Sequence, residues 1–314
     1  MLEPKVEVMQ ETRKPIVVAG SINMDLVAHT PRIPVPGETI TGSGFNTTPG
    51  GKGANQAVAA ARLGFRVQML GKVGEDVFGA SLIANLSEAG VDAAGVARVD
   101  GPSGVAPILV ADNGQNSIVV VPGANGKVDA AYIDAHTDLI RSAGMVLCQL
   151  ELPIATVCHV LALCAETCVP VILDPAPAAA LPDAIWGQVA WFTPNETEAA
   201  FYLGETLSPE DGAKRLLARG LKGVVLKRGG EGSYVAVAGG ESAWVPAFKV
   251  DVVDTVGAGD CFNGAFGVAL LEGKDPFAAA RFAAAAAAIS VTRHGAQASM
   301  PTRAEVDAFL ATHN

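Results

Sequence analysis

Short apolar runs alternate with longer, helix-like segments along most of the chain, and several of the runs end at a polar residue. Glu151, Asp174 and Asn195 each follow such a run. Alternation of this kind predicts βαβ units and a largely parallel sheet. Because ligands bind beyond the carboxyl ends of the strands in open α/β sheets, we expect these three residues to line one crevice.

The two kinds of segment can be assigned to residue ranges. The predicted strands are 16–19, 67–70, 145–149, 169–173, 190–193 and 224–227. The predicted helices are 54–63, 78–89, 129–141, 154–166 and 209–219. No internal repeat or low-complexity linker separates them. We therefore expect residues 15–314 to form one α/β domain, a three-layer sandwich with a mostly parallel central sheet, and residues 1–14 to form an N-terminal tail.

Two stretches break this alternation. Residues from about 23 to 49 carry Pro31, Pro34, Pro36 and Pro49 with β-branched residues between them. Residues 104–121 have the pattern of a hairpin, because an Asn-Gly turn at 113–114 lies between two apolar runs. We expect the two stretches together to form a small inserted β-sheet that acts as a lid over the crevice. The alternative is two ordinary surface loops.

The formal net charge of −10 argues against nucleic acid or an acidic membrane as a partner. A phosphate group would therefore have to be held by local groups: backbone amides, a helix N-terminus, lysine and Mg²⁺. No apolar run reaches the ~18 residues of a membrane span, and the first 14 residues are charged, unlike a secretory signal. The five cysteines lack paired C-x-x-C spacing, which is typical of a reduced cytoplasmic protein.

The segment Asp-Thr-Val-Gly-Ala-Gly-Asp at 254–260 is the sharpest local motif, and an apolar helix from about 261 to 271 follows it. Small residues leave successive N–H groups free at a helix start, where they can bind an oxyanion. Asp260 lies beside this nest and could take a proton from a hydroxyl that attacks phosphorus. The alternative is that Asp260 only caps the helix.

A second glycine-rich segment, 48–56, runs directly into a predicted helix with Lys52 and Asn55 at its start. Its amides, cation and side-chain amide could bind hydroxyls or an anion. It is not a P-loop, because Gly53 rather than Ser or Thr follows Lys52. The chain also lacks the G-x-G-x-x-G, H-E-x-x-H and G-x-S-x-G motifs, which weakens the case for a nicotinamide enzyme, a zinc protease or a serine hydrolase.

These two segments, with Gly-Ser-Ile-Asn-Met-Asp at 20–25, Pro-Gly-Glu-Thr at 36–39 and Thr-Pro-Asn-Glu-Thr-Glu at 193–198, resemble the PfkB-type carbohydrate kinases. The resemblance covers about residues 15–310 and is most specific to the ribokinase branch. It implies a ribokinase-like fold and transfer of the γ-phosphoryl group of ATP to the 5-hydroxyl of D-ribose. A kinase of this family for another sugar or a nucleoside, and a non-catalytic sugar- or nucleotide-binding protein, remain alternatives.

The resemblance also implies roles for individual residues. The implied sugar-binding residues are Asn23, Asp25, Gly51, Lys52, Asn55 and Glu151, with Asn23 and Asp25 at the end of the first strand. Asp260 matches the catalytic base, and the amides of Gly257, Ala258 and Gly259 match the anion hole. Asn195 and Glu198 match the pair that organises Mg²⁺ and the phosphates through water. The other implied nucleotide contacts are Lys227, Gly229, Gly232, Gly259 and Ala284.

Mg²⁺ bound with ATP, and K⁺ as an activating cation, are the cofactors that the resemblance implies. The positions that match the K⁺ site are Asp254, Val256, Ser290, Arg293, Gly295 and Ser299, most of them through backbone carbonyls. Residues 227–230 and Ala284 depart from the pattern of some relatives near the nucleotide, which leaves another triphosphate open as the donor. Because an open lid sheet would expose strand edges, we also expect a homodimer formed through the lid.

Overall fold

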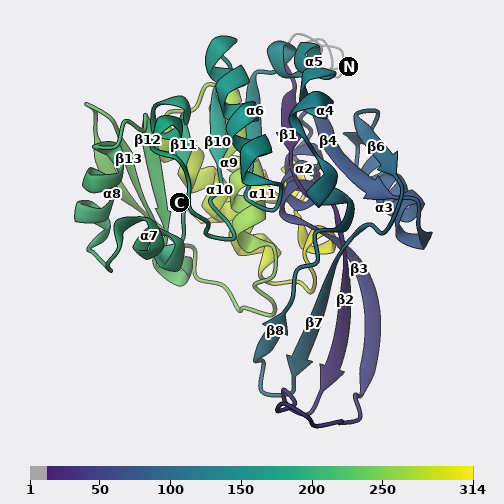
Figure 1. Cartoon of the computed structure of the whole chain (residues 1–314). Helices are drawn as coiled ribbons and strands as arrows, with labels where there is room; N and C mark the ends of the chain where they lie inside the picture. The colour runs from purple at the N-terminus through teal and green to yellow at the C-terminus, as the bar shows by residue number, and fades with distance from the viewer. Residues whose placement is uncertain (1–12, 314) are drawn as a thin grey trace, which may run out of the picture.

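The computed structural model describes residues 13–313, which form a main sheet, a smaller second sheet and the helices around them (Figure 1). The strands of the main sheet are β1 (Ile16–Ala19), β4 (Val67–Gly74), β5 (Val91–Asp92), β6 (Val96–Val99), β9 (Met145–Cys148), β10 (Val171–Leu173), β11 (Trp191–Phe192), β12 (Gly223–Lys227), β13 (Gly232–Val237) and β14 (Ser242–Pro246). They run in the order β14-β13-β12-β11-β10-β9-β1-β4-β5, and β6 also pairs with β4. Only the pairings of β13 with β12 and β14 are antiparallel. The predicted, mostly parallel sheet is confirmed.

Both faces of this sheet are buried, which explains the continuous apolar runs in the sequence. All four residues of β1 are inaccessible to solvent. Ile16 and Val18 pack into the core on one face, whereas Val17 and Ala19 pack into the core on the other. Parallel strands that are covered on both sides need apolar residues at every position, not at alternate ones.

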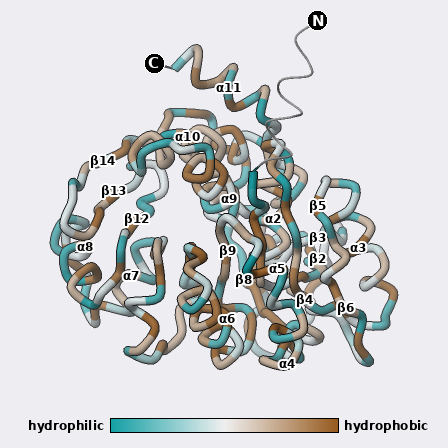
Figure 2. Tube along the Cα trace, turned by 90° about the horizontal axis from the view of Figure 1, so that it is seen from above, coloured by the Kyte–Doolittle hydropathy of each residue, from teal (hydrophilic) through white to brown (hydrophobic). Residues whose placement is uncertain are grey.

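Helices cover the two faces and complete the three layers. One face is covered by α2 (Lys52–Arg62), α3 (Val77–Glu88), α9 (Ala258–Leu271), α10 (Pro276–Ser290) and α11 (Arg303–Thr312). The opposite face is covered by α4 (Ala130–Asp134), α5 (Thr137–Ser142), α6 (Ile154–Glu166), α7 (Glu196–Leu203) and α8 (Pro209–Leu217). Figure 2 shows α10 and α6 on opposite sides of the strands.

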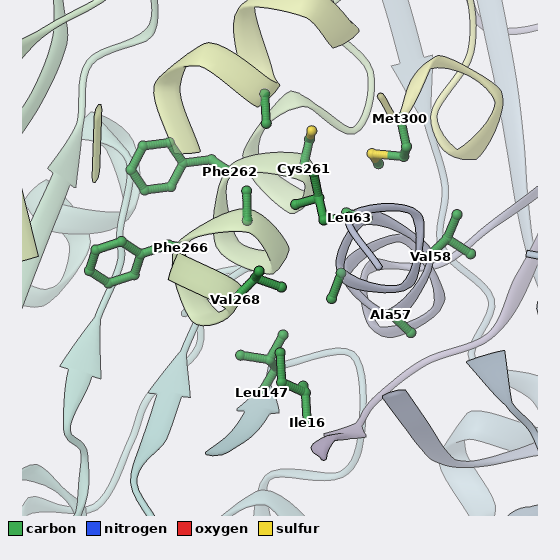
Figure 3. Packing of buried hydrophobic residues seen from close by; sticks show 14 of the residues in the cluster. Ile16, Ala57, Val58, Leu63, Leu147, Cys261, Phe262, Phe266, Val268 and Met300 are labelled. Atoms are coloured by element: carbon green, nitrogen blue, oxygen red, sulfur yellow. The ribbon is translucent and has the colours of Figure 1, made fainter. Parts of the chain in front are cut away.

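Close packing of α2 against α9 brings two distant parts of the chain together. Figure 3 shows Phe266 and Val268 of α9 and Val58 of α2 packed in one apolar cluster over the sheet. A Cβ atom added to Gly264 in α9 would lie 2.7 Å from the Gln56 carbonyl oxygen, so the glycine permits this short separation. The N-terminal turns of both helices therefore lie side by side, where the predicted active-site motifs begin.

The second sheet is made of β2 (Asn23–Thr30), β3 (Gly44–Gly50), β7 (Gly104–Ala111) and β8 (Asn116–Ile118), in the order β3-β2-β7-β8. β2 is antiparallel to β3 and parallel to β7, and β7 and β8 form the predicted hairpin. It projects from the main body of the molecule (Figure 1). The two stretches that interrupt the βαβ pattern thus form one small sheet, as predicted for the lid, and are not separate loops.

Several expectations need correction. The helix predicted over 129–141 is two short helices, α4 and α5, because His136 has a non-helical backbone conformation and its imidazole Nδ1 lies 2.8 Å from the Tyr132 carbonyl oxygen. The helix α9 begins at Ala258 rather than near Cys261. Asn23 and Asp25 lie at the start of β2 in the second sheet, not at the end of the first strand.

The predicted N-terminal tail falls almost entirely outside the described residues, which begin at Arg13. Arg13 itself lies 3.5 Å from the Glu272 carboxylate, measured between Nη1 and Oε1. Among residues 13–313, no helix combines the length and the apolar character needed to span a membrane.

Candidate active site

A cleft of about 480 Å³ lies where the carboxyl ends of the central strands meet the start of α9. Its lining includes Lys52, Asp174, Asn195, Glu198, Lys227, Gly229, Gly257, Gly259 and Asp260. Asp174 follows β10 and Asn195 follows β11, so two of the three polar residues expected to line one crevice do so. Glu151 is not part of this lining and lies against the glycine turn before α2, as described below.

Asp260 lies in the first turn of α9 and is 5% exposed. It does not cap the helix, because the N-cap residue is Gly257 and no side chain accepts a capping hydrogen bond from the first N–H groups of α9. Instead, the Asn55 side chain donates to Asp260 Oδ2 from 2.9 Å and the Gln56 side chain donates to Oδ1 from 3.2 Å. The Asp260 carboxylate is therefore held by two amides from another helix and does not act as a helix cap.

Each of these two amides is held in turn by a further buried amide. Gln297 donates to Asn55 Oδ1 from 3.1 Å, and Gln149 donates to Gln56 Oε1 from 2.7 Å. The carbonyl oxygens of Asn55 and Gln56 are thereby occupied, so both residues must present their N–H groups to Asp260. The chain of amides fixes the plane of the Asp260 carboxylate.

The electrostatic environment of Asp260 contains opposing influences. Burial raises its pKa above the ordinary value, and Asp174 adds to this effect, whereas Lys52 and the two amide hydrogen bonds lower it. Burial alone would lower the pKa of Lys52, but the carboxylates of Asp260, Asp174, Glu151 and Glu198 outweigh it and raise that pKa. Lys52 is therefore a permanent cation at the centre of an acidic cluster.

The start of α9 has the predicted glycine nest, with one change. Gly257 has a φ of 76°, a left-handed conformation that glycine adopts without strain. Within residues 13–313 the N–H groups of Gly257 and Gly259 have no hydrogen-bond acceptor, but the N–H of Ala258 donates to the Thr255 carbonyl oxygen from 3.2 Å. The nest therefore offers two free amides of the three predicted. A Cβ atom on Gly259 would lie 3.5 Å from Lys227 Nζ, so a cation faces the same space.

The opposite wall of the cleft is built on the start of α7. Asn195 caps this helix and forms a reciprocal capping box with Glu198. Lys227, the last residue of β12, donates from Nζ to Asp174 Oδ1 over 3.1 Å. Asp174 Oδ2 also accepts from Gln56 over 3.0 Å. Gln56 therefore bridges Asp174 and Asp260 with one amide group.

The base of the lid contributes Asp25 on β2, which pairs with Thr48 in the register and lies over Gly50. A Cβ atom added to Gly50 would lie 2.3 Å from Asp25 Oδ2. Burial, with repulsion from Glu151 and Asp260, raises the Asp25 pKa to about 7. A carboxylate whose pKa is raised in this way, next to a glycine turn, is typical of a ligand-binding group.

A model of the pfkB family of carbohydrate kinases matches residues 13–303. The chain belongs to this family. A ribokinase from Bacillus subtilis is 46% identical over 296 residues, which are 94% of this chain and 99% of the relative. A deoxyribokinase from Salmonella typhi is 37% identical over 301 residues, which are 94% and 98% of the two chains. The structure of Arabidopsis thaliana ribokinase complexed with ribose and ATP matches with a TM-score of 0.89 at 36% identity, over 95% of this chain and 99% of that one.

Not all residues implied for the nucleotide site of this pfkB kinase reach the cleft. Gly232 is absent from the lining, and its φ of 112° and the 2.2 Å from its added Cβ to the Val245 carbonyl oxygen show that the β13–β14 pairing requires it. Ala284 lies in α10 and is half-buried against the apolar cluster that α10 forms with α2 and α9. Among the residues implied for the sugar site, Glu151 accepts hydrogen bonds from the Lys52 amide over 3.1 Å and from the Ser21 hydroxyl over 2.5 Å.

The residues implied for a monovalent cation lie in the segment before α9 and in the segment from the end of α10 to the 3₁₀ helix η4 (Gln297–Ser299), and Asp254 joins the two segments. Its Oδ1 accepts from the Val256 amide over 2.9 Å, and its Oδ2 accepts from the Gly295 amide over 2.8 Å. The hydroxyls of Ser290 and Ser299 donate to the carbonyl oxygens of Ala287 and Ala296, respectively. The remaining residue, Arg293, is paired with Glu305 over 2.6 Å.

Sequence reasoning missed the supporting amides of this kinase site. Gln56 and Gln149 lie next to predicted functional residues, but nothing in their spacing marks them as partners of Asp260 or of each other. Gln297 is 242 residues away from the Asn55 side chain that it contacts. Asp174 was predicted to line the crevice, but its pairing with Lys227 was not.

Proposed function

We propose that the chain transfers the γ-phosphoryl group of ATP to the 5-hydroxyl of D-ribose, with Asp260 as the general base. The observation that carries the proposal is the buried Asp260 carboxylate, which lies beside two free amides and is oriented by two side-chain amides. The choice of D-ribose as the phosphoryl acceptor is supported by the 46% identity to a ribokinase and by the likeness to a ribokinase complexed with ribose and ATP.

In this mechanism, the residues position the reactants and stabilise charge. Asp260 takes the proton of the attacking hydroxyl. The free amides of Gly257 and Gly259, with Lys227 beside them, stabilise the charge on the transferring group. Asn23 and Asp25 hold the sugar hydroxyls at the base of the lid, and the lid excludes water, which would otherwise accept the phosphoryl group.

Mg²⁺ enters this scheme as part of the MgATP substrate. Within residues 13–313, no three His, Cys, Asp or Glu side chains are grouped to hold a metal ion. The carboxylates of Asp174 and Glu198, however, line the cleft and are the oxygen ligands that Mg²⁺ prefers. The residues therefore fit an ion that arrives with the phosphates, keeps several waters and neutralises phosphate charge.

The decisive experiment measures ADP release from MgATP with a panel of sugars and nucleosides, in K⁺ and in Na⁺ buffer. We expect turnover to be selective for D-ribose and higher in K⁺, because Asp254 holds together two segments beside the cleft whose carbonyl oxygens could bind K⁺. Equal turnover in both buffers would refute the K⁺ site, and the absence of turnover with every acceptor would leave a binding protein.

A second candidate is a kinase of the same family for another sugar or a nucleoside. The 37% identity to a deoxyribokinase favours 2-deoxy-D-ribose as the alternative acceptor. Turnover in the same panel that is higher with 2-deoxy-D-ribose than with D-ribose would keep the mechanism and reassign the pocket at the base of the lid.

Substituting Gly50 with Ala tests the sugar-binding role of Asp25 from the backbone side. The new methyl group would force the Asp25 carboxylate to move, since their separation would be 2.3 Å. We expect the KM for D-ribose to rise about 10-fold, the loss of one hydrogen bond, with the KM for MgATP unchanged. Gly187→Ala is the matched control, because a Cβ atom there meets no atom within 4 Å. An unchanged ribose KM would remove Asp25 from the site.

The lid also supports the proposed homodimer. Phe45 on the edge strand β3 is 67% exposed, and Ile118 on the other edge strand, β8, is 50% exposed. We expect light scattering to give twice the monomer mass, and Ile118→Lys to shift the population towards the monomer by charging the edge. A monomeric wild-type protein at micromolar concentration would contradict this proposal.

A cytoplasmic location stays a prediction from the sequence.

A further inference from the structure

Asn125 is a fully buried side chain of the 3₁₀ helix η1 (Gly123–Lys127), which the motif analysis leaves unused. Its amide contacts the start of the lid at three points. The Ile22 amide donates to Asn125 Oδ1 over 2.9 Å, Asn125 Nδ2 donates to the Ile22 carbonyl oxygen over 3.3 Å, and the same Nδ2 donates to Asn23 Oδ1 over 2.7 Å.

These contacts fix the orientation of two amide groups. A backbone N–H can only donate and a backbone carbonyl can only accept. The Ile22 N–H must therefore face Asn125 Oδ1, and the Ile22 carbonyl oxygen must face Asn125 Nδ2. Asn125 Nδ2 is therefore a donor, and its second hydrogen requires an acceptor. Asn23 must consequently present Oδ1 to Asn125 and must turn its own Nδ2 the other way.

The Nδ2 of Asn23 is then a donor without a partner. Asn23 is 2% exposed, and its Nδ2 makes no hydrogen bond within residues 13–313. Although the residue as a whole is buried, Nδ2 itself remains accessible to solvent, so the hydroxyl of a bound ligand can accept a hydrogen bond from it. Asn23 lies next to the glycine turn, since a Cβ atom on Gly51 would be 2.7 Å from its backbone nitrogen.

A glycine in the neighbouring strand leaves room for this arrangement. Gly104 of β7 pairs with Asn23 in the parallel register. A Cβ atom on Gly104 would lie 2.2 Å from both Asn125 Nδ2 and Asn23 Oδ1. Any other residue at this position would separate the two amides.

We infer that Asn125 is a positioning residue that makes Asn23 a hydrogen-bond donor to the acceptor sugar. The inference rests on the proposed function. Asn23 and Asp25 are two residues apart on one strand and therefore on the same face. They present one donor and one acceptor, which matches a sugar with two hydroxyls, one accepting from Asn23 and the other donating to Asp25. The orientation of Asn23 thus contributes to sugar specificity.

Steady-state kinetics of variants at pH 8.5 tests this role. Asn23→Asp keeps an oxygen for Asn125 and replaces the free donor by an acceptor, so we expect kcat/KM for D-ribose to fall about 10-fold or more, mostly through KM. Asn125→Asp allows the Asn23 amide to turn round and should have a similar effect. The KM for MgATP should not change. Asn113→Asp, in the exposed β7–β8 turn, is the matched control.

A double-mutant cycle separates positioning from a merely structural role. In an Asn23→Ala background Asn125 has no side chain to orient, so adding Asn125→Asp should change kcat/KM for ribose by less than about twofold. If Asn125→Asp lowers kcat/KM in the Asn23→Ala variant as much as it does in the otherwise wild-type protein, the inference is overturned. If Asn125→Asp fails to fold, Asn23→Asp alone decides the matter, and wild-type kcat/KM in that variant would equally overturn it.

Amide proton exchange provides a readout that does not require activity. In the sugar-free protein, we expect the two Nδ2 protons of Asn125 to exchange with solvent slowly in NMR spectra and those of Asn23 to exchange faster. The reverse order would refute the orientation. Absence of turnover with any pentose, combined with the expected exchange rates, would refute the proposed function and leave the orientation of Asn23 standing.

Discussion

Replacing Asp260 with Asn is expected to lower kcat about 10²–10⁴-fold, the usual contribution of a general base, while the protein still folds. The substitution preserves shape but removes the group that takes the proton. Stability should change little, because two effects oppose each other. Loss of a carboxylate whose pKa burial raises is favourable, whereas one of the two amides, from Asn55 or Gln56, loses its acceptor.

The measurement is single-turnover phosphoryl transfer with D-ribose, together with a thermal melt. Asp138→Asn, an exposed carboxylate at the start of α5, is the control and should behave as the wild type. Near wild-type turnover in the Asp260 variant would show that Asp260 is not the base. A protein that does not fold would point to the amide network, and Asp260→Ala, which leaves both amides free, would then separate the two explanations.

Asp25→Asn should reduce activity and increase stability at the same time. A charged hydrogen bond contributes about 1.5–3 kcal/mol, so we expect kcat/KM for D-ribose to fall by about 10- to 150-fold. The variant should nevertheless melt at a higher temperature than the wild type at pH 8, because the ionised Asp25 carboxylate is partly buried and lies near the carboxylates of Glu151 and Asp260.

The pH dependence of this effect has a definite sign. The pKa of Asp25 rises from 3.8 in the unfolded chain to about 7 in the folded protein. Folding therefore becomes less favourable as pH rises from about 4 to 7, and the full destabilisation is present above pH 7. The stability gain of the variant should be larger at pH 8 than at pH 5. In the wild type, the KM for ribose should rise as pH falls below about 7, and this change should be absent in the variant.

Thermal melts at the two pH values, with ribose kinetics across the range, test both parts. Asp112→Asn, in the exposed turn at the far end of the lid, is the control. A variant that loses stability in proportion to its activity would show instead that Asp25 is a structural carboxylate that holds the turn at Gly50.

The sequence alone was sufficient for the layers of the fold and for the main chemical groups. The apolar run at 16–19 predicted a strand covered on both faces, and the Asn-Gly at 113–114 predicted a tight turn between paired strands; both predictions are confirmed. The position of Asp260 in the first turn of α9 also follows from a local pattern, the glycine-rich segment before it, whereas its role as a base stays a proposal. Local spacing encodes such features, since strand, turn and helix-start preferences act over a few residues.

Only the tertiary structure decided which groups support the chemistry. The contact of Gln56 with Asp260 spans 204 residues of sequence, and that of Asn125 with Asn23 spans 102. Amides of this kind have no characteristic spacing, because their partners come from packing of α2 against α9 and of η1 against the lid. The split of 129–141 into α4 and α5 also follows from a side-chain contact, that of His136. Hydrogen-bond direction within buried amides depends on every neighbour at once, and those neighbours meet only in the folded chain.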